Sequence, residues 1–227
     1  MKKSVLCVIL SLVLCIGLCL GLTACKKDEP EEPANTTVKQ VVYTGSVEFS
    51  ESEVIPVQLI LDDFGTFSLV STNGVGLPIG FWGMRKAGVG GVYRQSGSNV
   101  TFKTLVGEDI ATATTTTSSI TIDYQGFEFT LTKSEKTVET DELYGSYKGY
   151  LDDDFEVRLI LRGDNNWVLV EEDGDVSEFG KYKLTGNSFT GYYNARPTEI
   201  CAYGTVNGNT LSLNVEGDNI SFQKVVA

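Results

Sequence analysis

One strand pair occurs twice in this chain, at a constant separation of 100 residues. Large apolar residues stand two positions apart before and after a short turn: Leu59, Leu61, Phe67 and Leu69 in copy one, and Leu159, Leu161, Trp167 and Leu169 in copy two. Because side chains two positions apart share one face of a strand, each copy predicts a β-hairpin with one apolar face. The chain is thereby constrained to an all-β fold made of two similar units.

The repeat extends beyond this hairpin. Residues 91–101 match residues 180–190 at a separation of 89, and residues 120–133 match residues 211–224 at a separation of 91. The two starts, Tyr43-Thr44-Gly45 and Tyr147-Lys148-Gly149, match at 104. The separation changes only between predicted strands, as expected where loops differ in length and strand pairing is kept.

Each copy predicts about eight short strands joined by turns rich in Gly, Asn, Asp and Ser. The strands are expected at 41–49, 54–62, 66–71, 89–95, 99–104, 109–115, 119–124 and 127–133, and again at 144–151, 155–162, 166–172, 178–184, 187–194, 199–206, 210–215 and 219–225. Closing an eight-stranded meander into an up-and-down barrel removes its two edges. We therefore predict two tandem antiparallel barrels, with two β-sandwiches as the alternative.

This reading divides the chain into five parts. They are a signal peptide (1–24), a lipidated cysteine and acidic tether (25–40), a first barrel (41–136), an acidic linker (137–142) and a second barrel (143–227).

Composition excludes several kinds of function. The net charge of −12 would repel nucleic acid, so no nucleic-acid partner is expected. The chain has no histidine, which removes the usual general base and the commonest metal ligand. Only Cys25 and Cys201 lie outside the N-terminal apolar run, which excludes a disulfide framework, and Cys201 is expected to be a buried thiol.

The first 25 residues have the form of a targeting segment: Lys2 and Lys3, an apolar stretch from Val5 to Leu22, and small residues before Cys25. Leu22-Thr23-Ala24-Cys25 resembles a bacterial lipobox. The resemblance implies cleavage before Cys25 and its acylation with lipid such as palmitate, and hence an anchor in the bacterial cell envelope at the outer membrane. A transmembrane helix is the alternative, because the apolar stretch is long enough to span.

The following run, Lys26 to Pro33, is charged, contains two prolines and has no apolar residue, which is typical of an extended tether. A lysine and acidic run just after the lipidated cysteine resembles the surface-export signal of Bacteroidetes lipoproteins. A plain solvated spacer is the alternative. The eight-strand meanders that begin Tyr-x-Gly resemble the lipocalin-like or calycin-like barrels of Bacteroidetes lipoproteins, although neither start carries the Gly-x-Trp signature of classical lipocalins.

Alternation assigns large apolar residues to the barrel interiors: Val57, Leu59, Leu61, Phe67, Leu69, Ile120, Ile122, Phe129 and Leu131 in copy one, and Val157, Leu159, Leu161, Trp167, Leu169, Phe189, Leu211, Leu213, Ile220 and Phe222 in copy two. An eight-stranded barrel is just wide enough to be filled by side chains or to hold one small ligand. Filled interiors are favoured, with a small apolar cavity as the alternative. Trp167 is expected to be a core residue, with a role as a ligand platform as its alternative.

The connections after odd-numbered strands gather at one end of each barrel, and in copy two this end is acidic. Asp152, Asp153, Asp154, Glu171, Asp173 and Asp175 lie on two of these connections. Their oxygens predict a weak calcium site, with a solvated acidic face as the alternative. Acidic pairs such as Asp152 with Glu171 could serve a glycosidase, but they lie on turns where no cleft is predicted, so we expect no enzyme and no cofactor.

Copy one has its longest connection, residues 71–88, at the same end. Eleven residues in this connection have no equivalent in copy two, since the separation falls from 100 to 89. Phe81, Trp82, Met84 and Arg85 are the candidate binding residues, because aromatic side chains and arginine anchor protein contacts and stack on sugars. The alternative is that Trp82 folds back and plugs the barrel.

Together these patterns predict a lipid-anchored envelope protein that binds a small apolar ligand or a glycan at its loop-rich end without catalysis. The alternative is a structural or protein-interaction module of the cell surface with filled barrels. A void inside either barrel would favour the first hypothesis.

Overall fold

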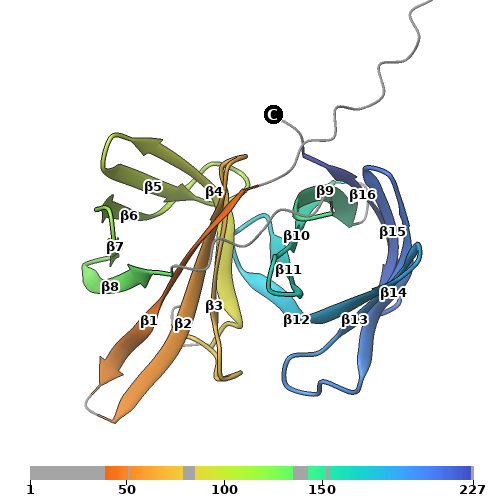
Figure 1. Cartoon of the computed structure of the whole chain (residues 1–227), viewed down its shortest axis with the longest axis horizontal. Helices are drawn as coiled ribbons and strands as arrows, with labels where there is room; N and C mark the ends of the chain where they lie inside the picture. The colour runs from red at the N-terminus through yellow and green to blue at the C-terminus, as the bar shows by residue number, and fades with distance from the viewer. Residues whose placement is uncertain (1–38, 51, 79–84, 135–142, 152–153, 226–227) are drawn as a thin grey trace, which may run out of the picture. The chain divides into compact units, whose positions relative to one another are not determined.

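The computed structural model describes residues 39–50, 52–78, 85–134, 143–151 and 154–225. Two closed, antiparallel, up-and-down barrels of eight strands each follow one another along the chain (Figure 1). The predicted fold class is confirmed, and the alternative of two β-sandwiches is wrong. The architecture is consistent with a lipocalin-like fold. No helix is found in the described residues, and so none that could span a membrane.

All sixteen predicted strands are present. The first barrel consists of β1 (Gln40–Ser50), β2 (Glu53–Asp62), β3 (Thr66–Ser71), β4 (Gly88–Ser96), β5 (Asn99–Lys103), β6 (Asp109–Thr115), β7 (Ser119–Tyr124) and β8 (Phe127–Lys133). The second consists of β9 (Gly145–Leu151), β10 (Phe155–Leu161), β11 (Asn166–Glu171), β12 (Val176–Thr185), β13 (Ser188–Tyr192), β14 (Ile200–Asn207), β15 (Thr210–Val215) and β16 (Asp218–Lys224).

The registers of the two opening hairpins agree with the repeat. Leu59 pairs with Leu69 in barrel one, and Leu159 pairs with Leu169 in barrel two. The first and last strands of each barrel close it: Thr44 pairs with Thr132, and Lys148 pairs with Gln223. The glycine that ends each Tyr-x-Gly motif lies against a side chain of the closing strand. A Cβ on Gly45 would lie 2.9 Å from Leu131 Cδ2, and one on Gly149 would lie 2.7 Å from Phe222 Cδ1. The glycine of this motif therefore lets the barrel close.

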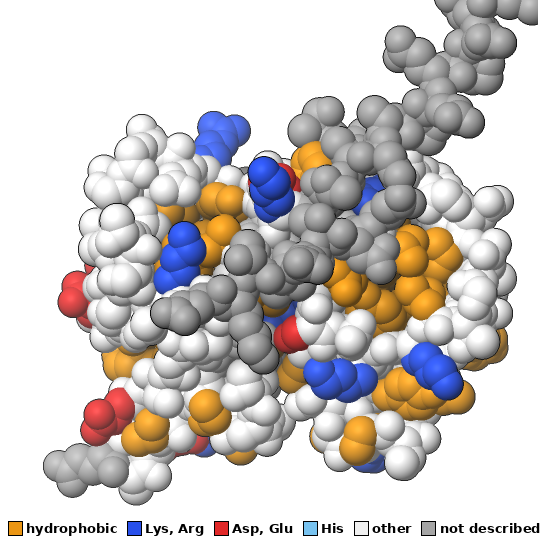
Figure 2. Space-filling view, viewed as in Figure 1, with side chains coloured by type: hydrophobic (Ala, Val, Ile, Leu, Met, Phe, Trp, Pro, Cys, Tyr) orange, Lys and Arg blue, Asp and Glu red, His pale blue; other side chains and the backbone are white. Residues whose placement is uncertain are grey.

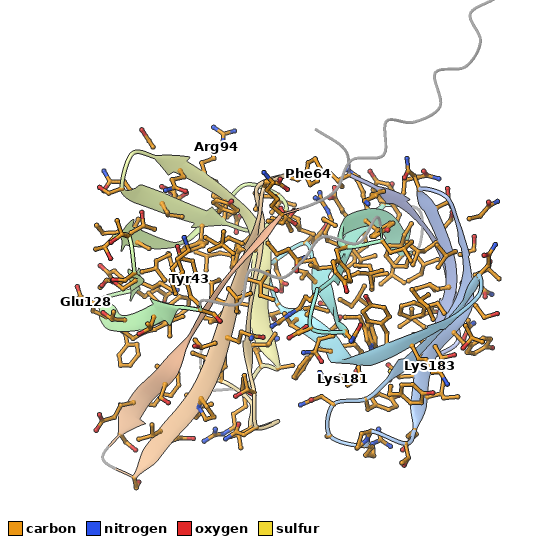
Figure 3. The ribbon with its side chains drawn as sticks, viewed as in Figure 1. Tyr43, Phe64, Arg94, Glu128, Lys181 and Lys183 are labelled. Carbon is orange, nitrogen blue, oxygen red and sulfur yellow. The ribbon has the colours of Figure 1, made fainter. Side chains whose placement is uncertain are left out.

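Each barrel has its own apolar core, and the predicted inward residues line it (Figure 3). Barrel two is densely filled, with Tyr147, Trp167, Phe189 and Phe222 almost wholly removed from solvent. Figure 2 shows hydrophobic side chains gathered within the ring of strands of barrel two. Trp167 is thus a core residue, as expected.

A third apolar cluster lies outside both interiors and joins the barrels. The outward side chains Ile160, Val168 and Val170 of β10 and β11 pack with Val70 of β3. The apolar runs 159–161 and 167–170 carry the signal for it, because alternation breaks where both faces of a strand are buried.

Polar contacts continue this junction. Gly90 of β4 donates its N–H to the carbonyl of Gly174 at 2.9 Å, and Leu105 N–H donates to the carbonyl of Glu172 at 3.1 Å. At the opposite end of the junction, Gly163 N–H donates to Gln40 Oε1 at 2.8 Å. The two barrels therefore share a packed and hydrogen-bonded face.

Candidate functional site

A small cavity lies inside barrel one, at the end where the connections after odd-numbered strands gather. Its volume is about 30 Å³, enough for roughly one water molecule or methyl group. Its walls are formed by Val47, Phe49, Leu59, Phe67, Leu69, Leu77, Val89, Phe102, Ile110, Ala111, Ile122, Tyr124 and Phe129. A void lined almost entirely by carbon takes an apolar group in preference to water.

The long connection of copy one covers this cavity with Leu77. Leu77 is about 1% exposed, and its backbone bonds to Lys86 in both directions, at 2.7 and 2.9 Å. These two bonds fold the connection back over the barrel end and direct Leu77 into the core. Leu77, which sequence reasoning did not single out, therefore covers the cavity, whereas Trp82 lies outside the described residues.

Barrel two has a different pair of residues at one place in its core. Phe67 and Phe102 meet in barrel one with ring centroids 4.7 Å apart. The repeat places Trp167 and Gly191 at these positions, and a Cβ on Gly191 would lie 3.0 Å from Trp167 Nε1. The larger indole occupies the space that the glycine leaves, which helps to fill the second interior.

The mouth of barrel two is polar where that of barrel one is apolar. Glu178 and Cys201 stand at the positions that Val89 and Ile110 occupy in copy one. Burial, together with the nearby charge of Glu216, raises the pKa of Glu178 to about 7. Burial also raises the pKa of Cys201 to about 12, which keeps this buried thiol protonated and unreactive.

The candidate binding connection is described only in part, since Phe81, Trp82 and Met84 lie outside the described residues. Arg85 is exposed, forms an ion pair with Glu53 at the start of β2, and donates to the carbonyl of Gly76 at 2.9 Å. Arg85 thus ties the connection to the β1–β2 hairpin.

The predicted calcium ligands that the structure describes lie in different environments. Asp152 and Asp153 lie outside the described residues, and Asp154 is exposed. Asp175 forms an ion pair with Lys86 of barrel one, and the turn from Glu171 to Asp175 lies against that barrel. Burial raises the pKa of Glu171, and Asp173 is exposed. In the ranges that the structure covers, no three Cys, Asp or Glu side chains are placed to hold a metal ion. The calcium site stays a prediction.

Comparison with known proteins leaves the chain without an assigned relative: no family model, curated protein or solved structure matches it. The fold and the cavity define the class, a tandem up-and-down β-barrel protein with a small apolar cavity in its first barrel. Cys25, the predicted lipidation site, lies outside the described residues.

Proposed function

We propose that this protein is a lipid-anchored, non-catalytic binding protein of the bacterial cell envelope, and that its first barrel accepts an apolar group. The observation that carries the proposal is the carbon-lined cavity of about 30 Å³ under Leu77. A void in an eight-stranded barrel favours ligand binding over a purely structural role. Its lining favours an apolar group over a glycan.

The difference between the two copies supports this assignment. Both copies form the same closed barrel, so the fold does not require a cavity or the long connection between β3 and β4 in copy one. Copy one has both features at the same end, and Leu77 brings them into contact. A feature of one copy that the other copy does not need in order to close its barrel is a candidate for function.

The cavity can be tested with xenon, an apolar atom small enough to enter protein voids. The mature chain carrying Cys25→Ser should bind xenon, detected by methyl shifts of Leu77 and Leu59 in NMR spectra. Leu77→Ala should enlarge the void and increase uptake. Ala111→Leu should fill the void and abolish uptake, whereas the matched change at an exposed position, Ala195→Leu, should have no effect. Equal uptake in Ala111→Leu would contradict the proposal.

The anchor has its own test. The thiol of Cys25 is the only atom at the lipobox that can accept the diacylglycerol, so Cys25→Ser should give an unprocessed precursor that takes up no labelled palmitate. Normal labelling of this variant would rule the anchor out. If the wild-type protein is acylated, proteolysis of intact cells distinguishes a surface-exposed protein from one that faces the periplasm.

A further inference from the structure

The seam that closes barrel one is paired over only two positions. Tyr43 pairs with Lys133 and Thr44 with Thr132. Beyond this point β1 continues to Ser50 and β8 extends back to Phe127, yet the register of the two described strands has no further pair between residues 45–50 and residues 127–131. Figure 1 shows the two strands diverging from their meeting point.

The unpaired part of each strand directs backbone groups into this gap. Val42 accepts a hydrogen bond from Ser134 across the seam, at 2.7 Å, so even-numbered residues of β1 face β8. Lys133 donates to Ser118 on the other side, at 2.8 Å, so even-numbered residues of β8 face β1. This parity directs the N–H and C=O groups of Ser46, Glu48, Glu128 and Thr130 into the gap.

A groove of about 430 Å³ follows the gap. Phe49 and Phe129 line this groove and also the apolar cavity, so these two rings separate the one from the other. The groove therefore offers backbone hydrogen bonds along its length and an apolar entrance at its base.

Like charges stand on both sides of the seam. Continuing the register of Thr44 with Thr132 places Glu48 opposite Glu128, and like charges facing each other across two strands are destabilising. Both side chains are exposed, and neither forms an ion pair with another described residue. Figure 3 shows Glu128 at the outer side of β8, away from Tyr43, which lies at the paired end. A cation between the two glutamates would relieve the repulsion.

Copy two has an equally short seam, in which Lys148 pairs with Gln223 and Tyr147 with Lys224, but it lacks the long hairpin beside the seam. The separation between equivalent residues falls from 104 to 100 between the first two strands, so the first hairpin of copy two is four residues shorter. β9 ends at Leu151, and the same register places Tyr150 opposite Ser221. The long hairpin beside the seam is therefore specific to copy one, where the cavity also lies.

We propose that the groove between β1 and β8 binds an extended basic peptide by strand addition. Its backbone pairs with the groups that β1 and β8 direct into the gap, and its outward lysine or arginine side chains lie beside Glu48 and Glu128. One inward apolar side chain points between Phe49 and Phe129 toward the cavity. This last contact rests on the proposed function, because it makes a peptide side chain the apolar group that the cavity accepts. In strand addition, backbone bonds supply affinity and side-chain pockets supply specificity.

The test uses a fluorescein-labelled peptide of alternating lysine and valine, about nine residues long as in an ordinary strand. The mature chain with Cys25→Ser should bind this peptide at low ionic strength and raise its fluorescence anisotropy. N-methylation of the lysines or of the valines removes the N–H donors along one edge, and at least one of these peptides should bind about tenfold more weakly. If both methylated peptides bind as tightly as the parent peptide, strand addition is overturned, and so it is if the parent peptide does not bind.

Protein variants test the location. Glu48→Lys combined with Glu128→Lys should weaken binding by about tenfold or more, whereas Asp218→Lys, an exposed acidic residue of barrel two, should have little effect. In NMR spectra, the amides of Ser46, Glu48, Glu128 and Thr130 should shift on addition of the peptide. Unchanged binding by the double variant would overturn the proposal.

Two further measurements separate this inference from the proposed function. If the protein takes up xenon but does not bind the peptide, the apolar cavity remains a binding site and the peptide proposal is overturned. Decanoate is the second probe. If decanoate shifts the NMR signals of the same four amides and the peptide does not, the groove binds an acyl chain and not a peptide. Peptide binding without xenon uptake would keep strand addition and remove the cavity contact.

Discussion

The indole of Trp167 lies directly over Gly191, so that a Cβ on the glycine would come within 3.0 Å of Nε1 and 3.1 Å of Cε2. Two phenylalanines occupy the equivalent positions of barrel one. Barrel two thus pairs a large side chain with a glycine, where barrel one pairs two side chains of similar size. Such compensating changes in volume between neighbours are expected in a closely packed core.

Gly191→Ala should therefore destabilise the protein by about 1–3 kcal/mol, because the added methyl overfills the core against the indole. The same change in a Trp167→Phe background should cost less or even stabilise, since the smaller ring leaves room. Denaturant unfolding of the two single variants and the double variant measures this coupling. Additive effects would show that the two residues do not compete for the same space.

Gly90 controls how closely the barrels approach. A Cβ at this position would lie 2.5 Å from Val170 Cγ2 of barrel two. Gly90→Ala should lower the melting temperature, and Val170→Ala in the same chain should recover part of the loss, although Val170→Ala alone is also destabilising. If Gly90→Ala is as stable as the wild type, the packed face between the barrels is absent in solution.

The second barrel should melt cooperatively on its own but at a lower temperature than in the whole protein. Each barrel has a separate core, which supports independent folding, but residues 143–227 alone would expose Ile160, Val168 and Val170. Each of these side chains contributes about 1.5–3 kcal/mol when fully buried. Calorimetry and dye binding of this fragment provide the measurement, and a broad transition without cooperativity would mean that barrel two needs barrel one to fold.

Arg162 is fully buried at the junction, where it donates to Gln58 Oε1 of barrel one and contacts Asp164 Oδ2 at 3.3 Å. Burial lowers the pKa of its guanidinium, and Nε and Nη1 have no hydrogen-bond partner in the structure. Asp164→Asn should destabilise by about 3 kcal/mol, because it leaves a buried charge without its counter-charge.

Arg162→Met should be within about 1 kcal/mol of the wild type or more stable, because it removes the buried charge itself. Asp218→Asn, at an exposed position, is the control for the loss of one carboxylate. Chemical denaturation of the three variants should rank Asp164→Asn as the least stable. The opposite order, with Arg162→Met the least stable, would mean that the ion pair stabilises the junction.

The stability of this protein should decrease as the pH rises toward neutrality. The pKa of Glu178 is raised from 4.5 to about 7, and burial raises that of Asp62 from 3.8 to about 6, so the folded chain holds these protons more tightly than the unfolded chain. The free energy of unfolding therefore falls as these groups ionise, between pH 4.5 and about 7 for Glu178.

Glu178→Gln should flatten this dependence in its upper range, and Asp62→Asn should flatten it in its lower range. Glu128→Gln, at an exposed position, should leave the slope unchanged. Denaturant unfolding across this pH window measures all three variants. If the free energy of unfolding of Glu178→Gln depends on pH as steeply as that of the wild type, another group is responsible for the titration.

The sequence alone determined the number, order and inward faces of the strands. Alternation of Leu59 with Leu61 and of Leu159 with Leu161 depends only on neighbouring residues, and the repeat supplied a second, independent copy of each pattern. Local periodicity is a property of single strands, so sixteen strands and two barrels could be derived without contacts between distant residues.

Only the tertiary structure decided which surfaces are free. The acidic turn from Glu171 to Asp175 looked solvent-exposed in the sequence, but Gly174 bonds to Gly90 and Asp175 pairs with Lys86 of the other barrel. The seam between β1 and β8 and the plug formed by Leu77 depend on residues that are distant along the chain. Such features arise from how closed barrels approach and where their strands diverge, and periodicity within one strand carries no information on either.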